Sequence, residues 1–144
     1  MPDHHRPDLT PALDTVDAYA HSMSVLRADE RRSLYSDSFR HELAGYSALD
    51  LFRQHAGNAG THDPLALIQY IDYKTWLVGD INTKVDRASM AHSLEVREPL
   101  MDHQLIEWLA TIPSSYKIHQ HEGKFFFKRA FEPQLPHDLL YRPK

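Results

Sequence analysis

The sequence predicts a mainly α-helical fold, built as an irregular array of eight or nine short helices. Apolar residues recur at helical spacing, and a capping residue or a proline stands at the start of most of these segments. No segment shows the apolar–polar alternation of a convincing half-buried strand. Because the connections are short, an irregular array is favoured over a bundle of long helices.

Four short helices are predicted before residue 63. Their start signals are Thr10 with Pro11, Asp29, Ser36 or Ser38, and Ser47. The first helix should run to about Leu26, and the second should continue through Tyr35. Gly45 should end the third helix, because glycine readily adopts the left-handed conformation of a helix end. The polar residues 57–61 should close the fourth as a loop.

The strongest helix start in the chain is the cap and first-turn proline at residues 63–64. Apolar residues then occupy nearly all faces of residues 65–78, which predicts a buried central helix. Gly79 and Asp80 should interrupt it, and Asp80 should cap the next helix, over residues 81–93.

Proline residues divide the last third of the chain. Pro99 should break the helical pattern, and Asp102 should cap a helix that ends at Pro113. Residues 116–118 are expected to be extended. A helix over residues 124–131 should follow Gly123, and Pro136 should open a last short helix.

Composition excludes several classes of function. The 144 residues are 42% hydrophobic and 25% charged, as in a globular domain, and the net charge of −4 leaves no basic surplus for nucleic acid. The chain has no cysteine, so a disulfide, a thiolate zinc site and a cysteine nucleophile are excluded within these residues. No apolar run reaches the length of a membrane span. We therefore expect a cytoplasmic protein with a loose N-terminus at residues 1–10.

One segment concentrates charge among small and apolar residues. Asp86 and Arg87 lie in the predicted helix, and Glu95 and Arg97 follow at its exit. Such charges should not all face water, and a buried charge must be paired. The residues alone therefore predict ion pairing among these groups or with a ligand, and a structural network is the simpler interpretation.

This segment also carries a resemblance to a known family. Residues 84–91, Ser93-Leu94-Glu95, Arg97, Pro99 and Asp102-His103 closely resemble the asparagine synthase pattern KVDRASMAxSLExRxPFLDH. Glu122-Gly123-Lys124 resembles the family's GEGK element, and residues 135–144 resemble LPxxxxxRPKxGF. The resemblance is strong from about Leu65 onward. Three departures are Leu100-Met101 for Phe-Leu, His121 for Gly and Val96 for Ala, and the combination is most similar to an exopolysaccharide-associated branch.

The resemblance implies an enzyme in which ATP activates the β-carboxylate of aspartate as an acyl-adenylate and glutamine-derived ammonia displaces AMP. It also implies ATP and Mg²⁺ as cofactors and a glutaminase domain with a nucleophilic cysteine. This chain has no such cysteine, no SGGxDS loop and no GSDE-type motif. We therefore expect residues 11–144 to be the helical C-terminal portion of a larger α/β synthetase domain, truncated at both ends. The isolated fragment should be inactive, bind no cofactor and self-associate through the face left by the nucleotide-binding sheet.

The same resemblance suggests roles for individual residues. Lys124 is the candidate catalytic residue, with Gly123 beside it on the phosphate-binding side. A cation at a helix start is disfavoured by the helix dipole unless an anion binds there, which agrees with that role. The other candidates should line the substrate side of the cleft or tie this region to the sheet: Lys84, Asp86, Arg87, Glu95, Arg97 and Asp102.

Simpler interpretations remain open at several positions. Lys124 is alternatively a solvated first-turn lysine. His119 and His121 have no acidic third ligand nearby in the sequence, so we expect no metal site. Residues 125–127, three consecutive phenylalanines, should be core contacts of one helix. As a whole, the chain is alternatively a non-catalytic helical adaptor derived from the family, or an unrelated interaction domain.

Overall fold

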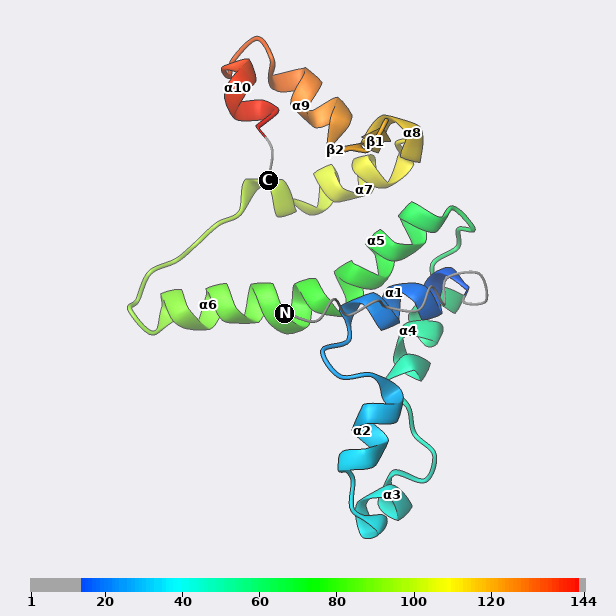
Figure 1. Cartoon of the computed structure of the whole chain (residues 1–144). Coiled ribbons are helices and arrows are strands. Elements are labelled where there is room, and N and C mark those ends of the chain that lie inside the picture. Colours follow the sequence, from blue (N-terminus) through cyan, green and yellow to red (C-terminus); the bar gives the residue numbers. More distant parts are fainter. Residues whose placement is uncertain (1–13, 143–144) are drawn as a thin grey trace, which may run out of the picture. The chain divides into compact units, whose positions relative to one another are not determined.

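The computed structural model describes residues 14–142 (Figure 1). Its internal contacts divide the chain into two units. Unit 1 is Met1–Val85 and unit 2 is Asp86–Lys144. The described residues form ten α-helices, one π-helix, one 3₁₀-helix and a two-stranded sheet. The prediction of a mainly α fold is confirmed. No helix of the described part is long and apolar enough to cross a membrane.

Unit 1 contains five α-helices followed by a π-helix and the start of another α-helix. Their bounds are α1 Thr15–Met23, α2 Ala28–Leu34, α3 Asp37–Leu43, α4 Ala48–Gly57, α5 Pro64–Lys74, the π-helix η1 Leu77–Asn82 and α6 Thr83–Met90. The helix α6 continues across the boundary into unit 2.

Three of the predicted starts in unit 1 are confirmed by the capping bonds. Ser36, Ser47 and Asp63 each accept a hydrogen bond from a backbone N–H of the first turn. The chain leaves α3 through the left-handed residues Ala44 and Gly45, as the glycine predicted.

The first two helices differ from the prediction at their ends. Asp14 caps α1, which therefore begins at Thr15 and ends at Met23, before the expected Leu26. Thr10 and Pro11 lie outside the described residues. Asp29 lies in the first turn of α2 instead of capping it. The Arg27 backbone N–H donates to the Glu30 carboxylate (2.7 Å), and Arg27 is the N-cap, so α2 starts two residues earlier than predicted.

The expected break at Gly79 and Asp80 is wrong. Both residues lie inside η1, which joins α6 directly. The Gly79 N–H still bonds to the Thr75 carbonyl (2.8 Å), and the Thr83 hydroxyl bonds to the Val78 carbonyl (2.8 Å). These bonds continue the helical hydrogen bonding past Gly79, so Asp80 is not a helix cap. Its carboxylate instead pairs with the Lys84 ammonium (3.0 Å).

A small core lies where α1, α4 and α5 contact one another. Val16 of α1 and Ile71 of α5 are the only buried hydrophobic residues among those described. The Tyr19 hydroxyl of α1 donates to the Asp72 carboxylate of α5, beside these residues. The prediction of a buried central helix over residues 65–78 is therefore wrong: Trp76 is 46% exposed and Val78 is 55% exposed.

Unit 2 consists of short elements around a small hairpin. Their bounds are the 3₁₀-helix η2 Pro99–Met101, α7 His103–Thr111, α8 Ser114–Lys117, β1 Ile118–His119, β2 Glu122–Gly123, α9 Phe125–Phe131 and α10 His137–Leu140. Asp102 caps α7 as predicted, accepting from the N–H groups of Gln104 (2.9 Å) and Leu105 (3.1 Å). Tyr116 is helical, which corrects the extended segment expected over residues 116–118.

The hairpin of β1 and β2 was not predicted. The strands pair antiparallel, with Ile118 opposite Gly123 and His119 opposite Glu122. Gln120 and His121 form the two-residue connection, and both have positive φ, 47° and 68°. This is the backbone geometry of a type I′ turn, which usually contains Asn and Gly.

Candidate functional site

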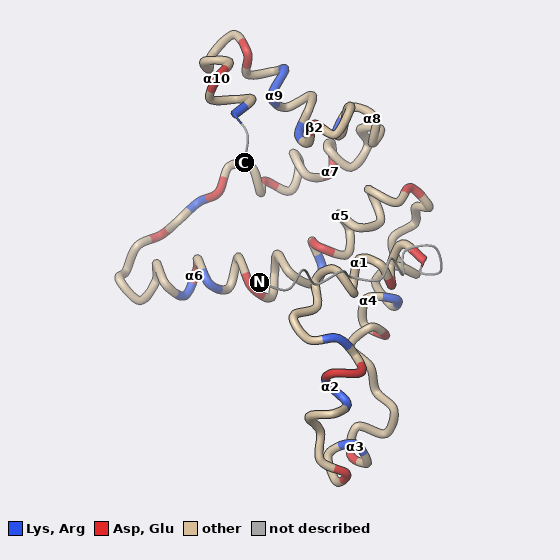
Figure 2. The backbone as a smooth tube through the Cα atoms, in the orientation of Figure 1, with Lys and Arg blue, Asp and Glu red and all other residues tan. Residues whose placement is uncertain are grey.

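The residues of the signature motif lie on α6, on the segment after it and at the start of α7 (Figure 2). All six candidates for the substrate side are exposed: Lys84, Asp86, Arg87, Glu95, Arg97 and Asp102. Asp102 uses its carboxylate to cap α7, so its structural role is defined. The structure therefore presents most of these charges to solvent.

The ion-pair network expected from the sequence is present only in part. Glu95 and Arg97 pair with each other, with 68% and 85% of their side chains exposed. Within residues 14–142, no ion pair joins Asp86 or Arg87 to another side chain. The expectation that these charged side chains are buried is wrong, because little of the rest of the chain packs against α6 and the segment that follows it.

Lys124 lies between the hairpin and α9 in an unusual backbone conformation. It is the N-cap of α9 with φ 58° and ψ 28°, in the left-handed region. This conformation is unfavourable for lysine, because its Cβ lies close to the following carbonyl oxygen, a contact that glycine avoids. Its side chain is exposed, and no hydrogen bond or ion pair within the described residues engages the ammonium. The lysine charge is therefore available to a ligand.

The neighbours of Lys124 form a connected polar cluster. Lys128 pairs with Glu122 of β2 and lies over the Tyr141 ring, 5.1 Å from its centroid. The Tyr141 hydroxyl donates to the Glu132 carboxylate (2.7 Å), which also pairs with Arg129 (3.3 Å). The hydrogen bond to Glu132 raises the pKa of Tyr141, because phenol donation stabilises the protonated form. The sequence analysis did not single out this cluster, although the spacing of Lys124 and Lys128 on one helix face hints at it.

The three phenylalanines of α9 contact other aromatic rings, as expected of core residues. Phe125 stacks on His119 (4.7 Å between centroids), and Phe126 meets Trp108 edge-on (6.0 Å). Phe127 contacts Phe131 of the same helix (4.8 Å). In the described part of the chain, no three His, Asp or Glu side chains gather as metal ligands.

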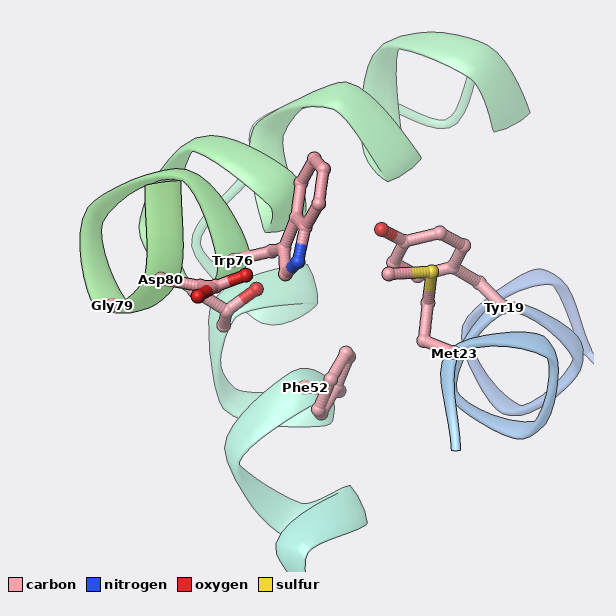
Figure 3. A pocket seen from close by; sticks show the side chains of 7 residues that line it. Tyr19, Met23, Phe52, Trp76, Gly79 and Asp80 are labelled. Carbon is pink, nitrogen blue, oxygen red and sulfur yellow. The ribbon is translucent and has the colours of Figure 1, made fainter. Parts of the chain in front are cut away.

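Unit 1 contains an open hollow of about 280 Å³ that the sequence did not predict (Figure 3). Aromatic rings from α1, α4 and the region before η1 face it. Its lining residues are Tyr19, Met23, Phe52, Thr75, Trp76, Gly79 and Asp80. Partial burial of Asp72 raises the pKa of its carboxyl group. Partial burial of Tyr73, together with the negative charge of Asp72, raises the pKa of the Tyr73 hydroxyl.

Comparison with known proteins decides the family. The sequence profile of the asparagine synthase family matches residues 3–144. The chain belongs to the asparagine synthase family. The predicted resemblance to this family is thereby confirmed, whereas the assignment to the exopolysaccharide-associated branch stays a prediction.

Individual relatives of this asparagine synthase family chain are similar over part of their length. A Mycobacterium tuberculosis protein named as a glutamine-hydrolyzing asparagine synthetase is 43% identical over 82 residues, 57% of this chain and 13% of its own length. Asparagine synthetase 3 of Bacillus subtilis is 42% identical over 69 residues, 48% of this chain and 11% of its own. Asparagine synthetase 1 of the same organism is 27% identical over 128 residues, 89% of this chain and 20% of its own. No solved structure matches the chain significantly.

Proposed function

We propose that this chain is the helical C-terminal portion of the synthetase domain of an ATP-dependent amidotransferase. The enzyme converts aspartate, or a related carboxylate, to its amide through an acyl-adenylate, using ammonia from glutamine. It acts in the cytoplasm, in asparagine biosynthesis or a similar amide-forming reaction. Family membership and the names of the relatives support this proposal.

The observation that carries the proposal is Lys124. Its ammonium is exposed and has no partner among the described residues, while its backbone is held in a strained conformation. Backbone strain is found at functional sites more often than elsewhere. A preorganised cation without a partner is suited to stabilise charge that develops on phosphate oxygens as the acyl group is transferred.

The residues beside Lys124 fit the phosphate end of ATP. Gly123 is exposed, and a Cβ added there would meet no atom within 4 Å, so a phosphate has room to approach the backbone. We assign Gly123 and Lys124 to this contact. Mg²⁺ would be bound mainly through the nucleotide, as is usual for this ion. When bound, ATP supplies the activated leaving group.

The remaining candidates would line the acceptor side. Lys84, Asp86 and Arg87 on α6 present their charges to solvent, and so do Glu95 and Arg97 after it. Exposed apolar side chains flank these charges: Met90, Leu94, Val96 and Leu100. We propose that this surface contacts the nucleotide-binding sheet of the same enzyme, which also has a glutaminase domain. In the isolated chain, the same surface would support self-association.

The test is substitution of Lys124 in the complete enzyme. Lys124→Ala should lower kcat for amide formation by about 10²- to 10³-fold, as loss of other preorganised donors does. Glutamine hydrolysis should change little, because it takes place in a separate domain. Amide product and released ammonia are measured together. Lys124→Arg should rescue only in part, since a planar guanidinium places its charge differently.

A matched control is Arg32→Ala, which removes an exposed cation from α2 and should leave both reactions unchanged. Near wild-type amide formation by Lys124→Ala would refute the catalytic role. No amide formation by the unsubstituted complete enzyme would instead favour the alternative of a non-catalytic helical adaptor.

A further inference from the structure

Lys128 lies where three elements of unit 2 meet. It stands on α9, its ammonium pairs with Glu122 of β2, and it lies over the ring of Tyr141, which ends α10. Only 21% of the Lys128 side chain is exposed. Lys124, one turn earlier, is exposed. The lysine that caps α9 and the lysine within α9 therefore have opposite environments, and only Lys124 is free to meet a ligand.

The aromatic partner of Lys128 is itself held in place. The Tyr141 hydroxyl donates to Glu132 of the α9 C-terminus (2.7 Å), and Arg129 pairs with the same carboxylate (3.3 Å). This hydrogen bond raises the pKa of Tyr141, because it stabilises the protonated hydroxyl. The ring that receives the Lys128 cation is thus fixed to α9.

Lys124 is constrained on both sides by Lys128. The Glu122 carboxylate, two residues before Lys124, is bound by the Lys128 ammonium. The Lys124 carbonyl, on the other side, accepts a hydrogen bond from the Lys128 N–H (2.9 Å). A lysine in the left-handed region returns to a more common conformation unless its surroundings hold it.

We propose that Lys128 is a positioning residue, which fixes the hairpin and the left-handed backbone of Lys124 so that the Lys124 ammonium faces the phosphate. The proposal rests on the function proposed for Lys124. The charge of Lys128 is essential to it, because the bond to Glu122 is charge-assisted and the contact with Tyr141 is a cation–π interaction. An arginine keeps the charge that both contacts use, whereas a glutamine can donate only an uncharged hydrogen bond to Glu122 and provides no cation for the Tyr141 ring.

The first experiment uses nuclear magnetic resonance on the 144-residue chain. Lys128→Gln should weaken the strong intraresidue amide-to-α-proton contact that marks positive φ at Lys124. The amides of residues 123 and 128 should exchange roughly fivefold faster or more, after correction for intrinsic rates. Lys128→Arg should stay within about twofold of the wild type. Arg142→Gln is the matched control: it removes an exposed cation near Tyr141 that no ion pair of the described residues joins to Glu122 or Glu132, and should also stay within about twofold.

Glu122→Gln removes the same ion pair from the other partner and should loosen the same amides, which keeps the test valid if Lys128→Gln fails to fold. Unchanged exchange and an unchanged Lys124 signal in both variants would overturn the positioning role.

The second experiment separates this inference from the proposed function. In the complete enzyme, Lys128→Gln should lower kcat for amide formation by about tenfold, with little change in KM for ATP, and Lys128→Arg should restore it. If the hairpin loosens but amide formation is unaffected, the positioning of Lys124 stands as a structural fact and its catalytic role fails. If kcat falls without loosening of the hairpin, the positioning inference fails and Lys128 acts in another way.

Discussion

The two units of this chain differ in the contacts that stabilise each of them internally. Unit 1 has a small apolar core at Val16 and Ile71, where three helices pack. Unit 2 has no buried residue among those described, and its short elements are joined by ion pairs, ring contacts and a two-stranded hairpin. Most of the family motif lies in unit 2. The residues that identify the family are therefore largely separate from the residues that form the core.

This difference predicts that the two units respond separately to mutation. Trp76 lies in unit 1 and Trp108 in unit 2, and they are the only two tryptophans. A Trp108→Phe background therefore reports on unit 1, and a Trp76→Phe background reports on unit 2. The stability of each variant is therefore measured separately from Trp76 fluorescence and from Trp108 fluorescence.

The largest expected effect is in the core of unit 1. Ile71→Ala should lower the free energy of unfolding of unit 1 by about 2–5 kcal/mol, because Ile71 is fully buried and its removal leaves a cavity. Denaturant titration followed by Trp76 fluorescence measures this loss. Leu34→Ala, at a residue 68% exposed, is the control and should change stability by less than about 0.5 kcal/mol. An equal loss in the Trp108 signal would show that the chain unfolds as one unit.

The next effect concerns the hydrogen bond from Tyr19 to Asp72. Tyr19→Phe keeps the ring but leaves a half-buried carboxylate without its donor, which should destabilise unit 1 by about 1–3 kcal/mol at neutral pH. The loss should be smaller in acid, where a protonated Asp72 no longer needs the donor. A loss of equal size at both pH values would show that packing of the Tyr19 ring, and not the hydrogen bond, is responsible.

The pH dependence of unit 1 should follow Asp72. Burial raises its pKa above the ordinary value of 3.8, so the native state binds a proton more readily than the unfolded state. The stability that Asp72 contributes is complete below pH 3.8 and is lost as the pH rises through the raised pKa. Asp72→Asn should remove this decline while keeping an acceptor for Tyr19. The free energy of unfolding is measured from Trp76 fluorescence at several pH values in the weakly acidic range. The same dependence on pH in the wild type and in Asp72→Asn would contradict the prediction.

The sequence predicted the features that depend on local chemistry. Ser36, Ser47, Asp63 and Asp102 were identified as caps because a short polar side chain satisfies the free N–H groups of the next turn. The same reasoning failed at Asp80, where the helix continues as a π-helix and the carboxylate pairs with a lysine instead. A capping residue thus indicates a helix start only where the preceding helix ends.

Burial was the least predictable property. Residues 65–78 and residues 85–97 both have sequences typical of buried segments, yet most of their side chains are at least partly exposed. Burial depends on what packs against a segment, and a sequence pattern does not state the partner. The proposed phosphate contact was located through the family resemblance at Lys124, whereas its support by Lys128 became visible only when Glu122 and Tyr141 were seen around it.

The smallest expected effect is in the hairpin of unit 2, whose turn has none of the usual turn residues. His121 occupies a left-handed position with φ 68°, which costs a residue with a Cβ about 1–2 kcal/mol, while glycine loses about 0.5–1 kcal/mol of chain entropy. His121→Gly should therefore stabilise unit 2 by roughly 0.5–1 kcal/mol, the difference between these two terms. His119→Gly should have the opposite effect, because His119 lies in β1 and stacks on Phe125. Denaturation followed by Trp108 in the Trp76→Phe background measures both changes. Opposite signs at two positions so close in the chain would show that the backbone conformation of the turn, and not the loss of a histidine side chain, sets the stability of this unit. Two destabilising changes would instead show that His121 contributes contacts that outweigh the strain of its backbone.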